Sequence, residues 1–134
     1  MQIVTAGILE KNGKIFIAKR KKGKCLKDKW EFPGGKLENG ETPEECLKRE
    51  LFEELNIQIK VEKYFCSSFF KCGEVEIELQ AYLVSYLSGE IKIVDHDDFK
   101  WIKPSEMLDF EFVEPDIVIV NKLLQEKYNI QKTY

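Results

Sequence analysis

The sequence predicts one domain that combines strands and helices, of the α/β or α+β class. The chain has 134 residues, which suits one domain over residues 1–134 with a single core. Its hydrophobic fraction of 43% and charged fraction of 34% are typical of a globular protein. Segments with strand-like alternation surround two segments with helical spacing, so both kinds of element are expected.

The first elements are expected to be two strands and a basic loop. Residues 3–9 are mostly apolar, Asn12-Gly13 is a strong hairpin signal, and residues 14–19 form the returning strand. Seven lysines and arginines lie within residues 19–29, which predicts either a solvated loop or a positive rim that attracts phosphate. Pro33-Gly34-Gly35 predicts a tight turn whose glycines permit close backbone approach.

A helix is expected from Pro43 to Leu55. Thr42 can cap it, proline suits its first position, and Glu45 completes a capping box. Asn56 tolerates the left-handed conformation that commonly follows a helix. One stripe of this helix is apolar and should face the core; it comprises Leu47, Leu51 and Leu55.

The adjoining face of this helix carries Glu50, Glu53 and Glu54, with Arg49 placed to bridge to Glu53 or back to Glu45. Like charges at spacings of three and four destabilise a helix by a few tenths of a kcal/mol per pair, roughly. A divalent cation such as Mg²⁺ or Mn²⁺ would remove this conflict, because hard cations take oxygen ligands. A solvated acidic face is the alternative, and the attached spacing to Gly35 favours the metal.

The second half of the chain predicts further strands and a last helix. Residues 57–70 are strand-rich, residues 71–74 form a turn, and alternation over 75–84 indicates a half-buried strand. A polar loop ends at Asp98, before a short strand over 99–102 and a helical turn that begins at Pro104. The final helix is expected over 116–128, with Asp116 as its N-cap.

Composition excludes several classes of function. No run of about 18 apolar residues is present and the N-terminus does not resemble a signal peptide, so a cytoplasmic location without membrane contact is expected. The net charge of −3 argues against binding of nucleic-acid polymers. The four cysteines lack a C-x2-C pair and are expected as reduced thiols, although Cys66 and Cys72 could lie across a hairpin. His96 is the only histidine, so a histidine-based metal site or triad is not available.

Residues 35–57 resemble the Nudix box, G-x5-E-x7-R-E-U-x-E-E-x-G-U, where U is aliphatic; they read GKLENGETPEECLKRELFEELNI. Every fixed position matches except Asn56, where the family has glycine. The preceding WEFPGG resembles the MutT-like or (d)CTP pyrophosphohydrolase-like branch. The resemblance implies an α/β/α sandwich with a mixed central sheet.

The resemblance also implies hydrolysis of a nucleoside diphosphate linked to another group, with Mg²⁺ or Mn²⁺. By position, the implied metal ligands are the backbone carbonyl of Gly34 and the carboxylates of Glu50, Glu53 and Glu54. Arg49 matches the arginine that orients these carboxylates, and Glu41 matches the acid that lies behind them. The base that activates water is either Glu50 or Asp95, which lies six residues before Trp101.

Other positions are expected to contact the substrate. Arg20 matches a phosphate-binding arginine of MutT-like enzymes, and Gly35 lies beside the carboxylates. Asp116 matches a residue that faces the base, a role compatible with that of an N-cap. Three aromatic residues are expected in the core, with stacking on the base as the alternative; they are Phe70, Tyr82 and Phe112.

These observations predict a Mg²⁺-dependent nucleoside triphosphate diphosphohydrolase, a monomer or homodimer, that releases a nucleoside monophosphate and pyrophosphate. Its expected substrates are 8-oxo-dGTP or (d)CTP-type nucleotides. An ADP-ribose or sugar-nucleotide pyrophosphatase is the alternative within the enzyme class. Outside it, a nucleotide-sensing module without catalysis and a divalent-ion binder without a substrate stay open.

Overall fold

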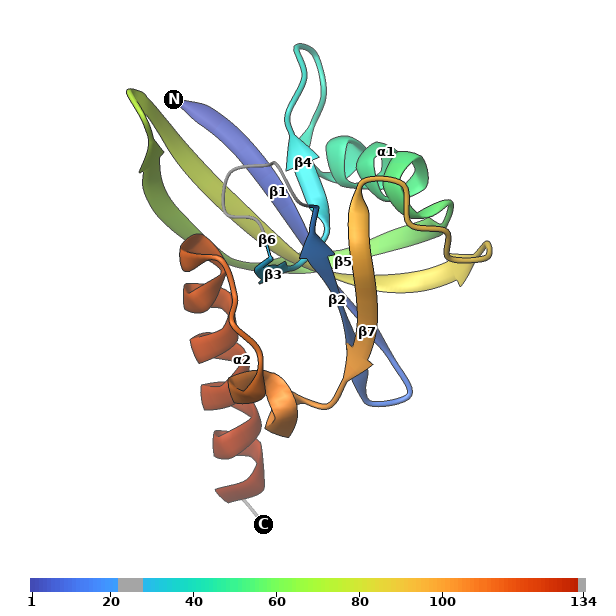
Figure 1. The fold of residues 1–134 in the computed structure, drawn as a ribbon, viewed down its shortest axis with the longest axis vertical. Coiled ribbons are helices and arrows are strands. Elements are labelled where there is room, and N and C mark those ends of the chain that lie inside the picture. Colours follow the sequence, from blue (N-terminus) through green and yellow to red (C-terminus); the bar gives the residue numbers. More distant parts are fainter. Residues whose placement is uncertain (22–27, 133–134) are drawn as a thin grey trace.

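The computed structural model describes residues 1–21 and 28–132 (Figure 1). Much of the predicted basic loop, residues 22–27, therefore lies outside the described residues. The elements in chain order are β1 Gln2–Lys11, β2 Lys14–Arg20, β3 Trp30–Glu31, β4 Gly34–Lys36, α1 Pro43–Leu55, β5 Gln58–Cys72, β6 Val75–Ser88, β7 His96–Ile102, the 3-10 helix η1 Pro104–Asp109, and α2 Glu114–Lys132.

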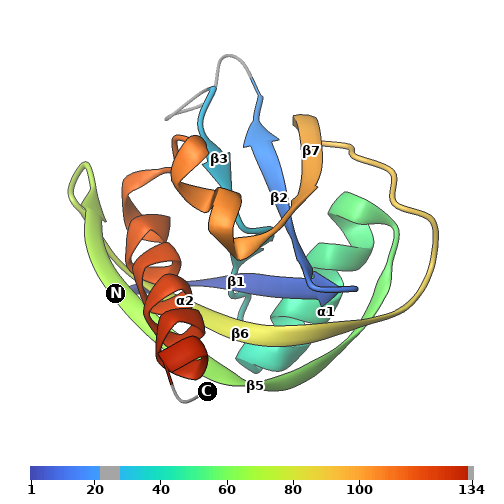
Figure 2. The same cartoon turned by 90° about the horizontal axis from the view of Figure 1, so that it is seen from below.

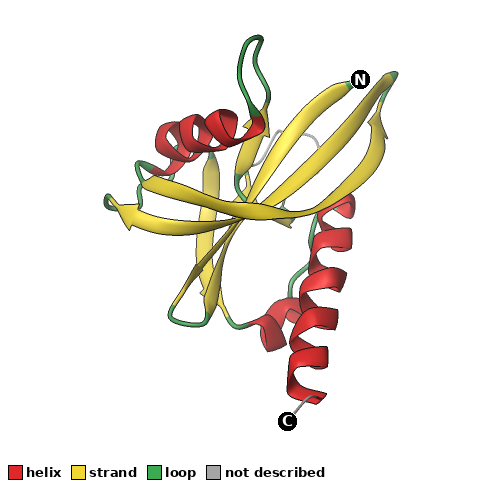
Figure 3. Cartoon of the chain, turned by 180° about the vertical axis from the view of Figure 1, so that it is seen from behind, coloured by secondary structure: helices red, strands yellow, loops and turns green. Residues whose placement is uncertain are grey.

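The described strands form one mixed sheet, as predicted. Its order is β3-β2-β1-β6-β5, with β4 also paired to β1 and β7 also paired to β2. β1 and β6 run parallel over Gln2 to Glu10, whereas the other pairs are antiparallel. Figures 2 and 3 show α1 and α2 on opposite sides of the long strands β1, β5 and β6. The predicted sandwich with helices on both faces is confirmed.

Alternation along the central strands divides the core into two parts. On β2, Ile15 and Ile17 belong to the cluster that contacts α2, whereas Phe16 and Ala18 belong to the cluster that contacts α1. Successive side chains of a strand point to opposite faces, so one buried strand supplies both clusters. The apolar stripe of α1 is fully buried, as its spacing predicted, and consists of Leu47, Leu51 and Leu55.

The boundaries of α1 agree with the sequence prediction. Glu45 N donates to the Thr42 hydroxyl at 3.2 Å, and Thr42 N donates to the Glu45 carboxylate at 2.8 Å, which forms the capping box. Asn56 follows the helix with φ 62° and ψ 33°, the left-handed conformation expected of it. The hairpin at Asn12-Gly13 is also present, with φ 54° and 78°.

The prediction of a tight turn at Pro33-Gly34-Gly35 was wrong. Gly34 and Gly35 instead belong to β4, which pairs with β1 opposite Ala6 and Thr5. The expected close backbone approach is present, because a Cβ atom on Gly34 would lie 1.9 Å from the Thr5 carbonyl oxygen. Adjacent glycines occur both in turns and in strands that approach another backbone closely. The sequence did not distinguish the two, because Thr5 on the partner strand lies 30 residues from Gly35.

Three other expectations need correction. α2 begins at Glu114, so Asp116 lies in its first turn and is not its N-cap. β7 begins at His96, so Asp98 lies in the strand rather than in a loop before it. Cys66 and Cys72 both lie on β5, so they cannot face each other across a hairpin.

Two further expectations concerned the cysteines and the absence of a membrane-spanning helix. Cys46, Cys66 and Cys72 are free cysteines, as expected of reduced thiols, whereas Cys25 lies outside the described residues. None of the helices within the described ranges is long and apolar enough to cross a membrane.

Candidate active site

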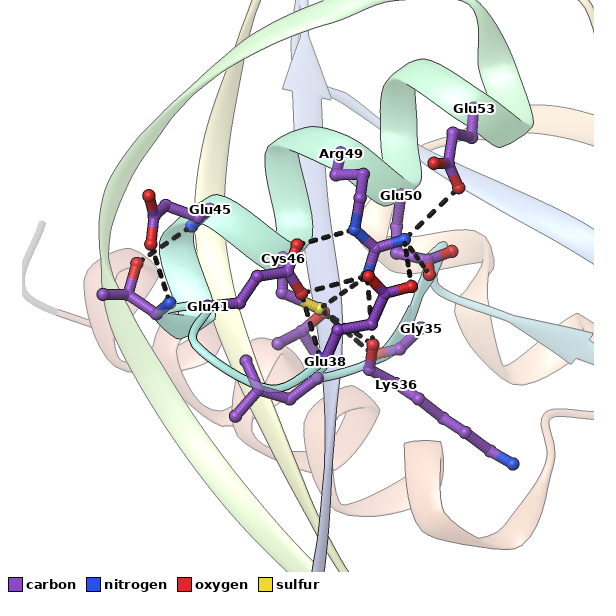
Figure 4. A network of polar contacts seen from close by, with 12 residues as sticks. Gly35, Lys36, Glu38, Glu41, Glu45, Cys46, Arg49, Glu50 and Glu53 are labelled. Carbon is purple, nitrogen blue, oxygen red and sulfur yellow. Dashed lines mark hydrogen bonds and ion pairs between the residues drawn. The ribbon is translucent and has the colours of Figure 1, made fainter.

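A cavity of about 290 Å³ lies beside β4, the start of β7 and the start of α2. Six of the residues predicted to form the site line it: Arg20, Gly34, Gly35, Glu54, Asp95 and Asp116. The other predicted residues lie next to it on α1 and the segment before α1, where they form a network around Arg49 (Figure 4). The fold therefore brings residues far apart in the sequence to one location.

Arg49 is held by carboxylates on several sides. Its Nε and Nη2 donate to the two oxygens of Glu41 at 2.6 and 3.0 Å, and its Nη1 contacts Glu50 at 2.9 Å and Glu53 at 3.3 Å. The bidentate contact with Arg49 lowers the pKa of Glu41 to about 2. The predicted bridge to Glu53 is present, whereas Glu45 is used by the capping box. Glu41 thus orients the arginine, and the arginine orients the acids of α1.

Glu50 lies directly against β4. A Cβ atom on Gly35 would lie 2.3 Å from the Glu50 carboxyl carbon, so any other residue would displace that carboxyl from its position against β4. Burial raises the pKa of Glu50, and the contact with Arg49 opposes that rise. The glycine of the box is therefore required by the position of a carboxylate on the neighbouring helix.

Glu54 is a partly buried acid of the group. Burial, followed by the nearby carboxylates of Glu50, Glu31 and Asp95, raises its pKa to about 8. Its Oε2 atom is buried and has no hydrogen-bond partner among the described residues. A divalent cation would supply positive charge to this acid and its neighbouring carboxylates.

The acids nevertheless do not form a ready-made ligand set. Within residues 1–21 and 28–132, no group of three or more His, Cys, Asp or Glu side chains is arranged to hold a metal ion. Arg49 forms ion pairs with Glu50 and Glu53, at 2.9 and 3.3 Å. The donor set fits a divalent cation in chemistry, because its side chains supply carboxylate oxygens.

Sequence reasoning missed a second network in the cavity wall. Glu31 binds Arg20 Nη1 through Oε1 at 2.9 Å and His96 Nε2 through Oε2 at 3.0 Å. All three residues line the cavity. The only signal in the sequence was that Glu31 belongs to the WEFPGG segment, because its partners lie on other strands.

Asp116 is a buried acid that lines the cavity. Its carboxylate accepts a hydrogen bond of 2.8 Å from Phe32 N, and burial raises its pKa to about 8. Phe70 also lines the cavity, as does Phe32, which had not been predicted. Tyr82 and Phe112 are buried core residues that do not line it, and Phe112 stacks on Phe32 at 5.4 Å.

Comparison with known proteins agrees with this architecture. The NUDIX domain family model matches residues 1–123. An 8-oxo-dGTP diphosphatase of Buchnera aphidicola is 35% identical over 121 residues, which cover 90% of this chain and 91% of that protein. A CTP pyrophosphohydrolase of Escherichia coli is 33% identical over 121 residues, which cover 90% of each chain.

The solution structure of the Escherichia coli ORF135 protein superimposes with a TM-score of 0.86 at 32% identity, covering 95% of this chain and 91% of that one. Enzymes of this family typically use a divalent metal. The family match and the shared fold lead to one conclusion: the chain is a Nudix hydrolase, in the branch that contains 8-oxo-dGTP diphosphatases and CTP pyrophosphohydrolase.

Proposed function

We propose that the chain is a Mg²⁺-dependent nucleoside triphosphate diphosphohydrolase that releases a nucleoside monophosphate and pyrophosphate. One observation carries the proposal: charged and apolar groups line a single cavity. The charged groups include Glu54 and Arg20, and the apolar groups, Phe32 and Phe70, line it together with Asp116. The charged groups suit a polyphosphate, and the apolar groups suit a base. The names of the related 8-oxo-dGTP diphosphatases and CTP pyrophosphohydrolase support a triphosphate substrate.

Mg²⁺, or Mn²⁺ in its place, would be held by the Gly34 carbonyl and the carboxylates of Glu50, Glu53 and Glu54. When bound, the metal would neutralise phosphate charge and lower the pKa of a water ligand. Arg20 would bind the phosphate chain, because a guanidinium matches phosphate oxygens in geometry and charge. Glu50 or Asp95 would accept the proton of the attacking water, while Arg49 and Glu41 orient the acids.

The base would lie against Phe70 and Phe32, within reach of Asp116. A carboxyl with a pKa of about 8 is mostly protonated at neutral pH, so it can both donate and accept a hydrogen bond. Such a group suits a base edge that presents a donor beside an acceptor, as 8-oxo-guanine and cytosine do. We therefore propose 8-oxo-dGTP or (d)CTP-type nucleotides as substrates.

We further propose that residues 1–134 act as one domain, as a monomer or homodimer in the cytoplasm, without a nucleic-acid or membrane partner. The match of the family model to residues 1–123 supports the single domain. The net charge of −3 supports the absence of a nucleic-acid partner. Size-exclusion chromatography with light scattering would distinguish monomer from dimer.

The proposal is tested with Mg²⁺ by measuring pyrophosphate and phosphate release from canonical (d)NTPs, 5-methyl-dCTP and 8-oxo-dGTP, and AMP formation from ADP-ribose. Glu53→Gln should abolish activity, whereas Glu44→Gln, on an exposed position of the same helix, should preserve it. Pyrophosphate from one triphosphate would support the proposal and name the base. Cleavage of ADP-ribose alone would indicate a sugar-nucleotide pyrophosphatase. Nucleotide binding without cleavage would indicate a sensor, and Mg²⁺ binding that no nucleotide affects would indicate an ion binder.

A further inference from the structure

Three strands place Arg20, Glu31 and His96 side by side in the cavity wall. β2 pairs with β7 so that Arg20 lies opposite His96, and it pairs with β3 so that Ala18 lies opposite Glu31. The β2–β7 register shifts between Lys19 and Arg20, which changes the alternation just before the arginine. Each carboxylate oxygen of Glu31 then has one partner, Arg20 at 2.9 Å and His96 at 3.0 Å.

This network is largely removed from solvent. The side chains of His96, Glu31 and Arg20 are 4%, 19% and 26% exposed. Although burial opposes ionisation of Glu31, the hydrogen bonds from His96 and Arg20 lower its pKa below the ordinary value. An ionised carboxylate only accepts hydrogen bonds, so His96 Nε2 is the donor. Glu31 is therefore an anion with a separate cationic or polar partner on each oxygen.

Stability alone is a weak explanation for this arrangement. Replacement of a buried ion pair by apolar residues is often neutral or stabilising, because the charges lose their hydration. The three strands are also already joined by backbone pairing along β2. A function of the network in the cavity explains why an anion is kept beside a site that would receive phosphates.

Glu31 is suited to orient Arg20. A guanidinium is planar, so a carboxylate that holds one nitrogen sets the direction of the whole group. An arginine side chain loses up to about 2 kcal/mol of rotamer entropy when it is immobilised. An arginine held in place before the substrate arrives does not incur that loss on binding.

The same carboxylate also acts on Asp95. His96 is anchored by Glu31, and Asp95 is the preceding residue and lines the same cavity. The segment before Asp95 is held to the end of α1, because Val94 N donates to the Glu54 carbonyl at 3.2 Å and Lys92 N donates to the Leu55 carbonyl at 3.0 Å. Asp95 is thus placed between two anchors, one on α1 and one on Glu31.

We propose that Glu31 is a positioning residue that directs Arg20 at the phosphate chain and, through His96, holds Asp95 in the cavity. The inference depends on the proposed triphosphate hydrolysis, with Arg20 as the group that binds the phosphate chain and Asp95 as the group that accepts the proton. Glu31 itself does not contact the substrate. Its contribution should appear in KM through Arg20 and in kcat through Asp95.

The test compares Glu31→Gln with Glu111→Gln, which changes an exposed glutamate paired with Lys29 at 3.2 Å. We expect Glu31→Gln to raise KM about tenfold and to lower kcat about tenfold, as loss of charge-assisted hydrogen bonds does. In an Arg20→Ala background, Glu31→Gln should no longer raise KM. Glu111→Gln should leave both constants unchanged.

A second pair of variants examines the histidine, in case Glu31→Gln does not fold. His96→Gln retains a side-chain N–H donor for Glu31, whereas His96→Ala removes it. We expect kcat to fall about tenfold in the alanine variant and to stay within about twofold of the wild-type value in the glutamine variant. If His96 had a purely structural role, its loss would instead lower the unfolding temperature, and kcat would not change independently of KM.

The results distinguish two kinds of failure. If the wild-type protein hydrolyses no triphosphate, the proposed function is wrong. If it does, two results would overturn the inference about Glu31. One is that Glu31→Gln leaves KM and kcat unchanged. The other is that Glu31→Gln raises KM as much in the Arg20→Ala background as in the wild-type protein. Equal kcat values in the two His96 variants would overturn the part of the inference that concerns Asp95.

Discussion

Replacement of Asp116 by asparagine should stabilise the folded protein relative to the wild-type protein, and this stabilisation should increase as the pH rises. Asp116 is 5% exposed, and its pKa rises from 3.8 to about 8, mainly through burial. The ionised form is therefore disfavoured in the folded state alone. This penalty is absent below the unfolded pKa, grows as the pH rises from about 4, and is constant above about 8.

The magnitude follows from the shift. Each pKa unit is worth about 1.4 kcal/mol, so the penalty at pH 7 is about 4 kcal/mol, and it grows by about 4 kcal/mol between pH 5 and pH 8. An asparagine oxygen can still accept the hydrogen bond from Phe32 N, and the amide does not titrate. The burial cost of the amide is the same at every pH, so the pH-dependent part belongs to the acid.

Urea unfolding at several pH values measures this difference. The advantage of Asp116→Asn over the wild-type protein should increase from pH 5 to pH 8 at an unchanged m-value. Asp109→Asn makes the same chemical change at an exposed position and should give no such trend. A stability difference that does not change with pH would refute the argument, because it would show that the buried carboxyl does not have a raised pKa.

Three further predictions concern the box. Gly35→Ala should abolish hydrolysis, because the new Cβ atom would displace the Glu50 carboxyl, which lies only 2.3 Å away. Asn56→Gly restores the family residue but removes the 3.1 Å hydrogen bond from Asn56 to the Glu90 carbonyl, and it should change the free energy of unfolding by no more than about 1 kcal/mol. Mg²⁺ should raise the unfolding temperature and EDTA should reverse the rise, because Glu54 lies among other acids and its Oε2 atom has no hydrogen-bond partner among the described residues.

The first of these predictions has a control variant, and each of the three has a result that would contradict it. Gly40→Ala changes a glycine with no atom within 4 Å of the new methyl group, so hydrolysis should persist there despite a positive φ of 83°. Activity in Gly35→Ala would show that the Glu50 carboxyl need not lie against β4. A loss of much more than 1 kcal/mol in Asn56→Gly would assign a larger structural role to the amide. An unfolding temperature unaffected by Mg²⁺ in the wild-type protein would contradict the metal assignment.

The predictable parts of the fold are those determined by neighbouring residues. The capping box of α1 and the left-handed Asn56 follow from side chains within a few positions, and the sequence predicted both. The pairing of β4 with β1 was missed because its determinant is the Thr5 backbone, far from Gly34 in sequence. The periodicity of a segment can indicate a strand, but it does not show which distant segment that strand pairs with.

The same reasoning separates the site residues. The acids of α1 were predicted because helical spacing places them on one face. The contacts of Glu31 were not, since its partners Arg20 and His96 belong to strands whose register only the folded sheet defines. Asp116 was expected to cap α2, and the helix instead begins two residues earlier, which places its carboxylate on Phe32 N.

The distribution of charge across the cavity argues that its acids serve a ligand. Glu41 forms a bidentate contact with Arg49 and has a lowered pKa, whereas the partly buried Glu54 and the buried Asp116 have pKa values raised to about 8. A fold optimised for stability alone would pair all of these acids or replace them with apolar residues. Glu41 and Glu31 are each paired with an arginine, whereas Glu54 Oε2 has no hydrogen-bond partner among the described residues and Asp116 accepts one hydrogen bond from Phe32 N. Glu54 would gain a partner from a cation and Asp116 from a base, so two parts of one nucleotide–metal complex account for both.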